Sequence, residues 1–110
     1  AIEYALNGFA VTQIIGGYWE NSVRGFHSTN DEITTMGKYP NAGQGFLDIY
    51  TVNGEAPVQG QRFKNPTLAQ TYSTIANEGC DAYYRGSLTP TIVNFLQSIG
   101  SHLTIEDFND

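Results

Sequence analysis

Apolar residues recur at helical spacing near both ends of the chain. Ile2, Ala5 and Leu6 share one helical face, and the Asn7-Gly8 pair is a typical helix stop. A second helix of about ten residues is predicted to follow Thr12, which can act as its N-cap. Its continuous apolar face comprises Ile14, Ile15, Tyr18 and Trp19. The Gly16-Gly17 pair weakens this helix by about 1 kcal/mol per glycine relative to alanine, so we expect another element to approach it closely.

The apolar pattern disappears between residues 21 and 45. Ser, Thr, Asn and Gly dominate there, and Pro40 lies within the stretch, so an irregular segment is predicted. A loop of this length is uncommon in a compact domain, so short helical turns or a neighbour outside this chain are expected to support it. Residues 46–52 are rich in β-formers, Asn53-Gly54 is a strong hairpin-turn signal, and Pro57 limits the return strand to a sheet edge. A two-stranded hairpin over about 46–59 is predicted.

Helix signals dominate the last third. Asn65-Pro66 reads as an N-cap and first helical residue, with Gly79 as the stop. Asp81 is expected to cap one turn that ends at Gly86. A further helix is predicted to hold Pro90 in its first turn and to stop at Gly100.

A capping-box type of start lies at Thr104 and Asp107, flanked by Leu103 and Phe108 as a hydrophobic staple. One turn later the chain ends, and since helix nucleation is costly, the native polypeptide is expected to continue past Asp110. Apolar residues that face the remainder of a larger protein should then be exposed, around the Ile14/Trp19 face or at Phe108.

These elements predict a mainly α fold, a small irregular helical bundle with one short β-hairpin, as a single subdomain over 1–110. A length of 110 residues suits one domain. The net charge of −6 argues against nucleic-acid binding, which needs a cationic surface. No apolar run approaches the ~20 residues that span a bilayer, so no transmembrane segment is expected.

Few residues suggest catalysis or ligand binding, and we expect no catalytic, cofactor-binding or metal-binding residue in this chain. The lone Cys80 is interpreted as a small buried hydrophobe, and His27 and His102 lack the spacing of metal ligands. Glu106 and Asp107 are interpreted as helix-start acids, because neighbouring side chains diverge on a helix. The remaining candidates are given structural roles. Ser101-His102 is not a nucleophile–base pair, Asp31-Glu32 is a solvated loop charge or local helix cap, and Gly43-Gln-Gly45 lacks the context of a phosphate cradle. One ring of Tyr83-Tyr84 is expected to pack under the Gly86 corner, while the other is half exposed.

Several of these segments together resemble the gamma-glutamyltransferase (gamma-glutamyltranspeptidase) family. They follow in the family's order: Ala1 to Val11 with its Gly-Phe-x-Val, Gly54-x-x-Pro57-x-x-Gly60, Asn65-Pro-x-Leu-Ala69, Ile75-Ala-x-x-Gly79, Tyr84-x-Gly86, Ile92-Val93 and Leu103-Thr-x-Glu-Asp107. The resemblance covers roughly two-thirds of the chain and omits 21–45. Ser101 departs from the glycine pair that the family usually has at 100–101.

The resemblance implies a segment of the large subunit of an N-terminal-nucleophile hydrolase of αββα architecture. Such a precursor cleaves itself, and a threonine at the new N-terminus of the small subunit transfers a gamma-glutamyl group to water, amino acids or peptides. No cofactor is implied, because the terminal amine serves as the base. The nucleophile and substrate groups would lie outside this chain, which would be inactive alone. Its expected partners are the rest of the large subunit and the small subunit, in an extracytoplasmic location. A stand-alone binding module, or a sister acylase acting on cephalosporin side chains or poly-glutamate, stays open.

Overall fold

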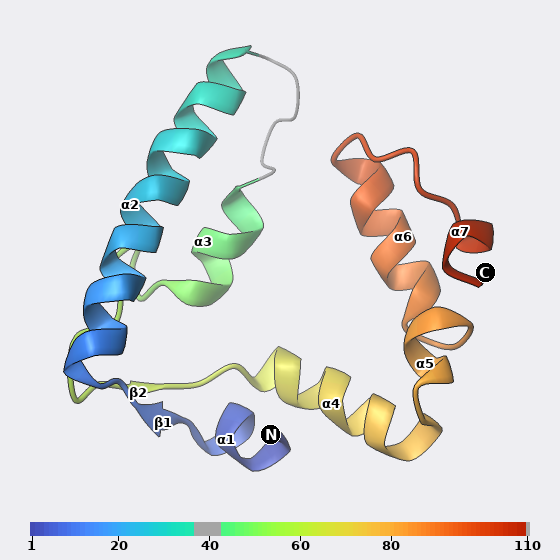
Figure 1. Ribbon diagram of the computed structural model, residues 1–110, viewed down its shortest axis with the longest axis horizontal. Coiled ribbons are helices and arrows are strands. Elements are labelled where there is room, and N and C mark those ends of the chain that lie inside the picture. The colour runs from blue at the N-terminus through green and yellow to red at the C-terminus, as the bar shows by residue number, and fades with distance from the viewer. Residues whose placement is uncertain (37–42, 110) are drawn as a thin grey trace. The chain divides into compact units, whose positions relative to one another are not determined.

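The computed structural model describes residues 1–36 and 43–109, and most of them are helical (Figure 1). The chain divides into two compact units, one formed by Asn7–Asn65 and one by Ala1–Leu6 with Pro66–Asp110. The expectation of a single subdomain over 1–110 stays a prediction. The elements are α1 (Ile2–Asn7), β1 (Phe9–Ala10), α2 (Gln13–Met36), α3 (Gln44–Tyr50), β2 (Arg62–Phe63), α4 (Pro66–Glu78), α5 (Asp81–Tyr84), α6 (Thr89–Ser98) and α7 (Ile105–Asn109).

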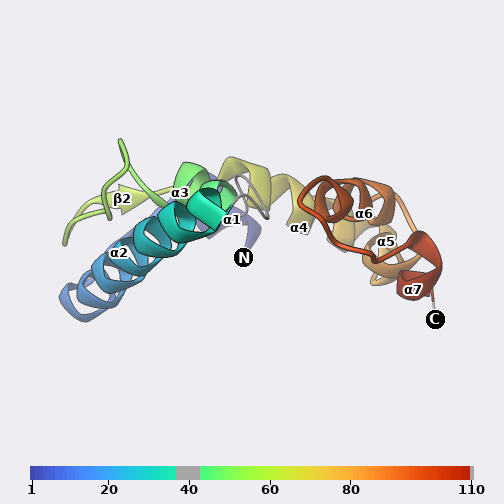
Figure 2. The same cartoon turned by 90° about the horizontal axis from the view of Figure 1, so that it is seen from above.

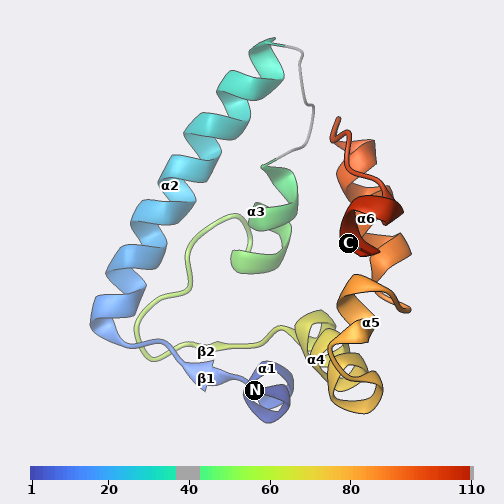
Figure 3. The same cartoon turned by 45° about the vertical axis from the view of Figure 1, so that its right-hand side comes forward.

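Helix α2 is much longer than the predicted helix of about ten residues. It runs unbroken through the first part of the stretch expected to be irregular, so that expectation is wrong for residues 21–36. The rest of the stretch, 37–42, lies outside the described residues. Helix α2 continues past its predicted end because Trp19, Val23 and Phe26 recur at helical spacing and face α3, which lies beside α2 in Figures 1 and 3. A few correctly spaced apolar residues therefore hold a helix that composition alone does not reveal.

The predicted strand over 46–52 is also wrong, because residues 46–50 belong to α3. Its apolar residues lie on one helical face: Leu47 is buried, and the ring of Phe46 stacks on Phe26 with centroids 3.8 Å apart. Packing against α2 thus overrides the β propensity of this segment. The Asn53-Gly54 turn itself is confirmed, with φ of 55° and 84° and one bridge between Val52 and Glu55.

The antiparallel pair of the fold joins two segments that lie far apart in the sequence. Phe9 of β1 pairs with Phe63 of β2, and Ala10 pairs with Arg62. Beside the pair, Gly8 has φ of 84° and is buried. A Cβ atom there would lie 2.7 Å from both Arg62 Cγ and the Phe63 carbonyl oxygen. Only glycine fits this position, because both its backbone angle and its surroundings exclude a side chain.

The core of the Asn7–Asn65 unit is small and aromatic. Val11, Val23, Leu47 and Phe63 are buried. Trp19 packs edge-on against Phe63 with ring centroids 4.6 Å apart, and its indole Nε1 donates a 2.8 Å hydrogen bond to the Tyr50 carbonyl. The bond satisfies a donor that would otherwise lose solvation.

Helices α4 to α7 follow the sequence signals closely. Helix α4 starts at Pro66 and is followed by Gly79 with φ of 79°, and Pro90 lies in the first turn of α6. The expected Asp81 cap is wrong, because Asp81 is already inside α5, whose N-cap position is Cys80. Figure 2 shows α5, α6 and α7 grouped together. Their buried residues are Ala82, Thr89 and Val93, and the Thr89 hydroxyl donates to the Tyr83 carbonyl at 2.9 Å.

Candidate functional site

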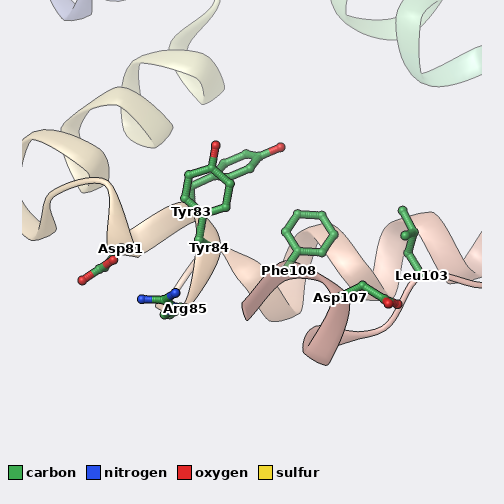
Figure 4. Close-up of a pocket in the computed structure, with 7 residues that line it drawn as sticks. All are labelled: Asp81, Tyr83, Tyr84, Arg85, Leu103, Asp107 and Phe108. Atoms are coloured by element: carbon green, nitrogen blue, oxygen red, sulfur yellow. The ribbon is translucent and has the colours of Figure 1, made fainter. Parts of the chain in front are cut away.

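An open pocket of about 550 Å³ lies on α5 and α7. Figure 4 shows its lining residues, which are Asp81, Tyr83, Tyr84, Arg85, Leu103, Asp107 and Phe108. The rings of Tyr83 and Phe108 have centroids 5.9 Å apart, so an aromatic contact connects the two helices. The Arg85 Nε donates a 3.0 Å hydrogen bond to the Asn109 carbonyl, where a cation near a helix C-terminus is favourable.

The carboxylate of Asp107 serves as a helix cap rather than as a catalytic group. Its Oδ2 accepts hydrogen bonds from the Thr104 backbone N–H at 2.8 Å and from the Thr104 hydroxyl at 2.9 Å. In return, the Asp107 N–H donates to the Thr104 hydroxyl at 3.4 Å, which completes the predicted capping box. These bonds, the backbone one above all, lower the pKa of Asp107, because they favour the charged carboxylate. A general acid would require the opposite shift.

The lowered pKa of Asp107 makes the start of α7 sensitive to acid. Because the folded-state pKa lies below the unfolded one, the cap stabilises α7 above the unfolded pKa, and this stabilisation is lost as the pH falls through the folded value. We expect hydrogen-exchange protection of the α7 amides to fall in acid, measured by NMR. Asp107→Asn should lower that protection at neutral pH and remove its acid dependence, whereas Glu106→Gln, in the same turn, should retain it. An acid profile that is unchanged in Asp107→Asn would contradict the capping role.

Two charged side chains of the pocket have hydrogen-bond partners within the chain. Its Asp107 is engaged in the cap and its Arg85 in the contact with Asn109. The lining residues include no serine, threonine or cysteine nucleophile beside a base.

The other residues considered from the sequence are scattered. His27 lies on α2, and its Nε2 is 2.9 Å from the Gly54 carbonyl oxygen. The Ser101 hydroxyl accepts a hydrogen bond from the Leu103 N–H at 3.2 Å, which gives it a local turn role beside the exposed His102. In the part of the chain that the structure describes, no three His, Cys, Asp or Glu side chains gather as metal ligands would.

Two predicted burials are wrong. Cys80 is exposed, because it lies in the turn between α4 and α5 rather than on an inward helix face. Both tyrosines of the 83–84 pair are exposed, Tyr83 by 38% and Tyr84 by 53%. The corner below them is filled by backbone instead, since a Cβ at Gly86 would lie 2.7 Å from Ala82 Cα.

Asp31 and Glu32 are not loop charges, because both lie within α2, where they are exposed. The glycine-rich 43–45 stretch is the start of α3, with Gly43 at the N-cap position. In its first turn the Gln44 Nε2 donates a 2.7 Å hydrogen bond to Asp48 Oδ1. The Gln44–Asp48 hydrogen bond joins successive turns of α3 and so supports this helix.

The exposed apolar residues of α2 are the most distinctive surface feature of the chain. Ile14 is 70% exposed and Tyr18 68% exposed, and neither Trp19 nor Phe108 is buried. Ile14 and Tyr18 are exposed as expected, whereas Trp19 of the same predicted face is half-buried against Phe63. An apolar groove of about 310 Å³ lies here, lined by Ile15, Tyr18, Trp19, Ser22, Phe46 and Tyr50. The contribution of α3 was missed from the sequence, although the i, i+4 spacing of Phe46 and Tyr50 could have indicated it.

No helix within residues 1–36 and 43–109 combines the length and the apolar character needed to cross a bilayer.

Known proteins resemble this chain over its whole length. It is 37% identical over 108 residues to the "Glutathione hydrolase-like YwrD proenzyme" of Bacillus subtilis (strain 168), which covers 98% of this chain and 18% of the relative. It is 32% identical over 107 residues to the "Oxamate amidohydrolase proenzyme" of Klebsiella pneumoniae, with 97% and 18% covered. The crystal structure of cephalosporin acylase from Bacillus halodurans superposes with a TM-score of 0.78 at 29% identity, covering 98% of this chain and 19% of that one.

The chain thus spans less than a fifth of the length of these relatives. The sequence pattern of the family described as gamma-glutamyltranspeptidase matches residues 1–110. A match over every residue is decisive, and the chain belongs to the gamma-glutamyltranspeptidase family.

Proposed function

We propose that this chain is a non-catalytic helical segment in the large subunit of a gamma-glutamyltransferase or glutathione hydrolase-like enzyme. The observation that carries this proposal is the exposure of large apolar side chains on helices that bury few residues of their own. Helix α1 has no buried residue, and its Tyr4 and Leu6 are 69% and 53% exposed. A six-residue helix of this kind is not stable in water alone, so its apolar side chains need cover from another part of a protein.

The same reasoning applies separately to α2. Ile14, Ile15 and Tyr18 form an exposed apolar row on α2, beside Trp19, which packs within the unit. We propose that the remainder of the large subunit and the small subunit cover these rows. In this arrangement the present chain supports the architecture, and the reacting groups come from elsewhere in the enzyme.

The enzyme as a whole would transfer a gamma-glutamyl group to water, amino acids or peptides after cleavage of its precursor. Two relatives carry the word proenzyme in their names, which supports the precursor. The catalytic threonine would use its own terminal amine as base, so no metal or cofactor enters the proposal. An extracytoplasmic location is part of the same proposal.

A second candidate activity is suggested by the names of two similar proteins. One protein at 32% identity is named an oxamate amidohydrolase, and the structure with a TM-score of 0.78 is a cephalosporin acylase. The second candidate is therefore an enzyme of the same family that cleaves an amide other than a gamma-glutamyl one. Assays of the complete enzyme with a gamma-glutamyl anilide, a cephalosporin side-chain amide and oxamate would separate the two candidates.

The purified 110-residue chain is expected to release no product from a gamma-glutamyl anilide above the buffer rate. The reason is that its described pocket pairs no nucleophile with a base. Absorbance of the released aniline measures the rate, and far-UV circular dichroism of the same sample shows whether the helices are present. The complete enzyme is the positive control. Turnover by the folded chain that rises with its concentration would refute the non-catalytic role.

A further inference from the structure

The chain contains two Asn-Gly dipeptides, and the structure places them in opposite environments. Asn7-Gly8 joins α1 to β1, whereas Asn53-Gly54 forms the turn between Val52 and Glu55. In such a dipeptide the backbone nitrogen of glycine can attack the asparagine side chain, because glycine has no Cβ to obstruct the approach. The reaction also requires the backbone to rotate, so the local structure determines its rate.

Asn53-Gly54 has little that holds it in place. Both residues are exposed, and no atom lies within 4 Å of the position that a Gly54 Cβ would take. Two hydrogen bonds close the turn, at 2.8 Å and 3.2 Å between Val52 and Glu55, while the Gly54 carbonyl contacts His27 Nε2 at 2.9 Å. Within the described residues the Gly54 N–H makes no hydrogen bond. A single exposed bridge opens readily, so the attacking nitrogen is accessible.

In the Asn7-Gly8 dipeptide Asn7 is exposed, but the glycine that carries the attacking nitrogen is enclosed. Gly8 is buried, and a Cβ there would lie 2.7 to 2.8 Å from atoms of Arg62, Phe63 and Lys64. The Arg62 Nη1 donates to the carbonyls of both Asn7 and Gly8, at 3.3 Å and 3.2 Å. Rotation about this peptide would break both bonds and displace the β1–β2 pair. The same dipeptide is therefore locked at one position and open at the other.

We infer that Asn53 is a site of spontaneous deamidation and that Asn7 is protected from it. The Gly54 nitrogen forms a bond to Cγ of Asn53, loses its proton to solvent base, and the Cγ–Nδ2 bond breaks to release ammonia. Water then opens the resulting five-membered imide at either carbonyl. The product is aspartate or isoaspartate at position 53, and no oxidation or reduction occurs.

Both products alter this corner of the molecule. Each adds one negative charge beside Glu55, in a chain whose net charge is already −6. Isoaspartate also passes the main chain through the side-chain methylene, which lengthens the turn. The Val52–Glu55 bridge and the His27 contact with Gly54 depend on the original turn, so both should be lost in the isoaspartate form.

Incubation of the native protein in mildly alkaline buffer, beside a sample unfolded in urea, tests this inference. Tryptic peptides over 1–24 and 39–62 report the two sites by mass spectrometry, and fragment ions separate position 53 from Asn41. In the native sample, Asn53 should deamidate about tenfold or more faster than Asn7, and in urea the two rates should converge. Equal rates in the native sample, or reaction of Asn53 only in urea, would overturn the inference.

Gly54→Ala provides a second test, because its Cβ obstructs the attacking nitrogen and meets no neighbouring atom. The φ of 84° strains an alanine here and loosens the turn, which by itself would not slow the reaction, so a slower rate reports the obstruction. Deamidation of Asn53 should slow about tenfold, while Asn7 in the same molecule should be unaffected. An unchanged rate at Asn53 would show that the product does not arise through the Gly54 nitrogen, which would also overturn the inference.

Discussion

Replacing Gly8 by alanine is expected to lower the free energy of unfolding by about 3 kcal/mol. Gly8 adopts φ of 84°, where an L-residue is strained by roughly 1–2 kcal/mol. The added Cβ would also lie 2.7 Å from the Phe63 carbonyl oxygen, which is backbone and cannot move aside without distorting the β1–β2 pair. Urea unfolding followed by far-UV circular dichroism measures the change.

Gly17→Ala is the matched control for this prediction. Gly17 lies inside α2, no atom lies within 4 Å of the position that its Cβ would take, and its φ is not positive. Alanine should therefore stabilise the helix by about 0.5–1 kcal/mol. If the two substitutions changed stability by the same amount and sign, the close packing around Gly8 would be refuted.

Trp19→Ala is expected to lower the free energy of unfolding by about 3 kcal/mol. The indole packs edge-on against Phe63 at 4.6 Å and near Tyr50 at 6.3 Å between ring centroids. Its Nε1 also bonds the carbonyl of Tyr50, the last residue of α3. Removal of the ring leaves a cavity and an unpaired carbonyl together. Trp19→Phe should keep most of the packing and cost about 1 kcal/mol for the lost hydrogen bond.

Tyr18→Ala, one position away on the same helix, is the control. Its side chain is 68% exposed and should contribute within about 0.5 kcal/mol. All three variants are compared by urea unfolding with circular dichroism, because two of them lack the chain's single tryptophan. A loss in Tyr18→Ala as large as that in Trp19→Ala would mean that the core of this unit is not where Trp19 lies.

Local signals predicted the ends of most helices. The cap at Thr104 and Asp107, the start at Pro66 and the stops at Gly79 and Gly8 all depend on a residue and its near neighbours in sequence. The signal for a helix end is contained in a few neighbouring residues, because a cap satisfies backbone groups only one turn away. The mainly helical class followed from the same signals.

These local patterns could not predict packing between segments that are distant in the sequence. Residues 46–50 are helical where Phe46 stacks on Phe26 of α2 and Leu47 is buried, and α2 continues past its predicted end along its contact with α3. Pairing of Phe9 with Phe63 has no local signature at all. In each case the deciding partner is far away in sequence, so neither propensity nor periodicity could identify it.

In the candidate site, too, features that depend on neighbouring residues were predicted, and features that depend on distant ones were missed. The capping role of Asp107 was predicted, because its partner Thr104 is three residues away. The exposure of Cys80 follows from its place in the turn between α4 and α5. The exposure of both tyrosines accompanies the close approach of the Gly86 backbone to Ala82, which no sequence pattern reports. Arg85 as a pocket residue was likewise missed, since its partner is the backbone of Asn109.

The pairing of β1 with β2 has a consequence for synthesis on the ribosome. Helices α2 and α3 emerge before β2 does, so Phe9 and Trp19 must wait for Phe63 before their shared packing can form. Contacts between such distant residues are slow to form, because a long loop must close first. The nascent helices therefore carry uncovered aromatic rings until β2 has been synthesised.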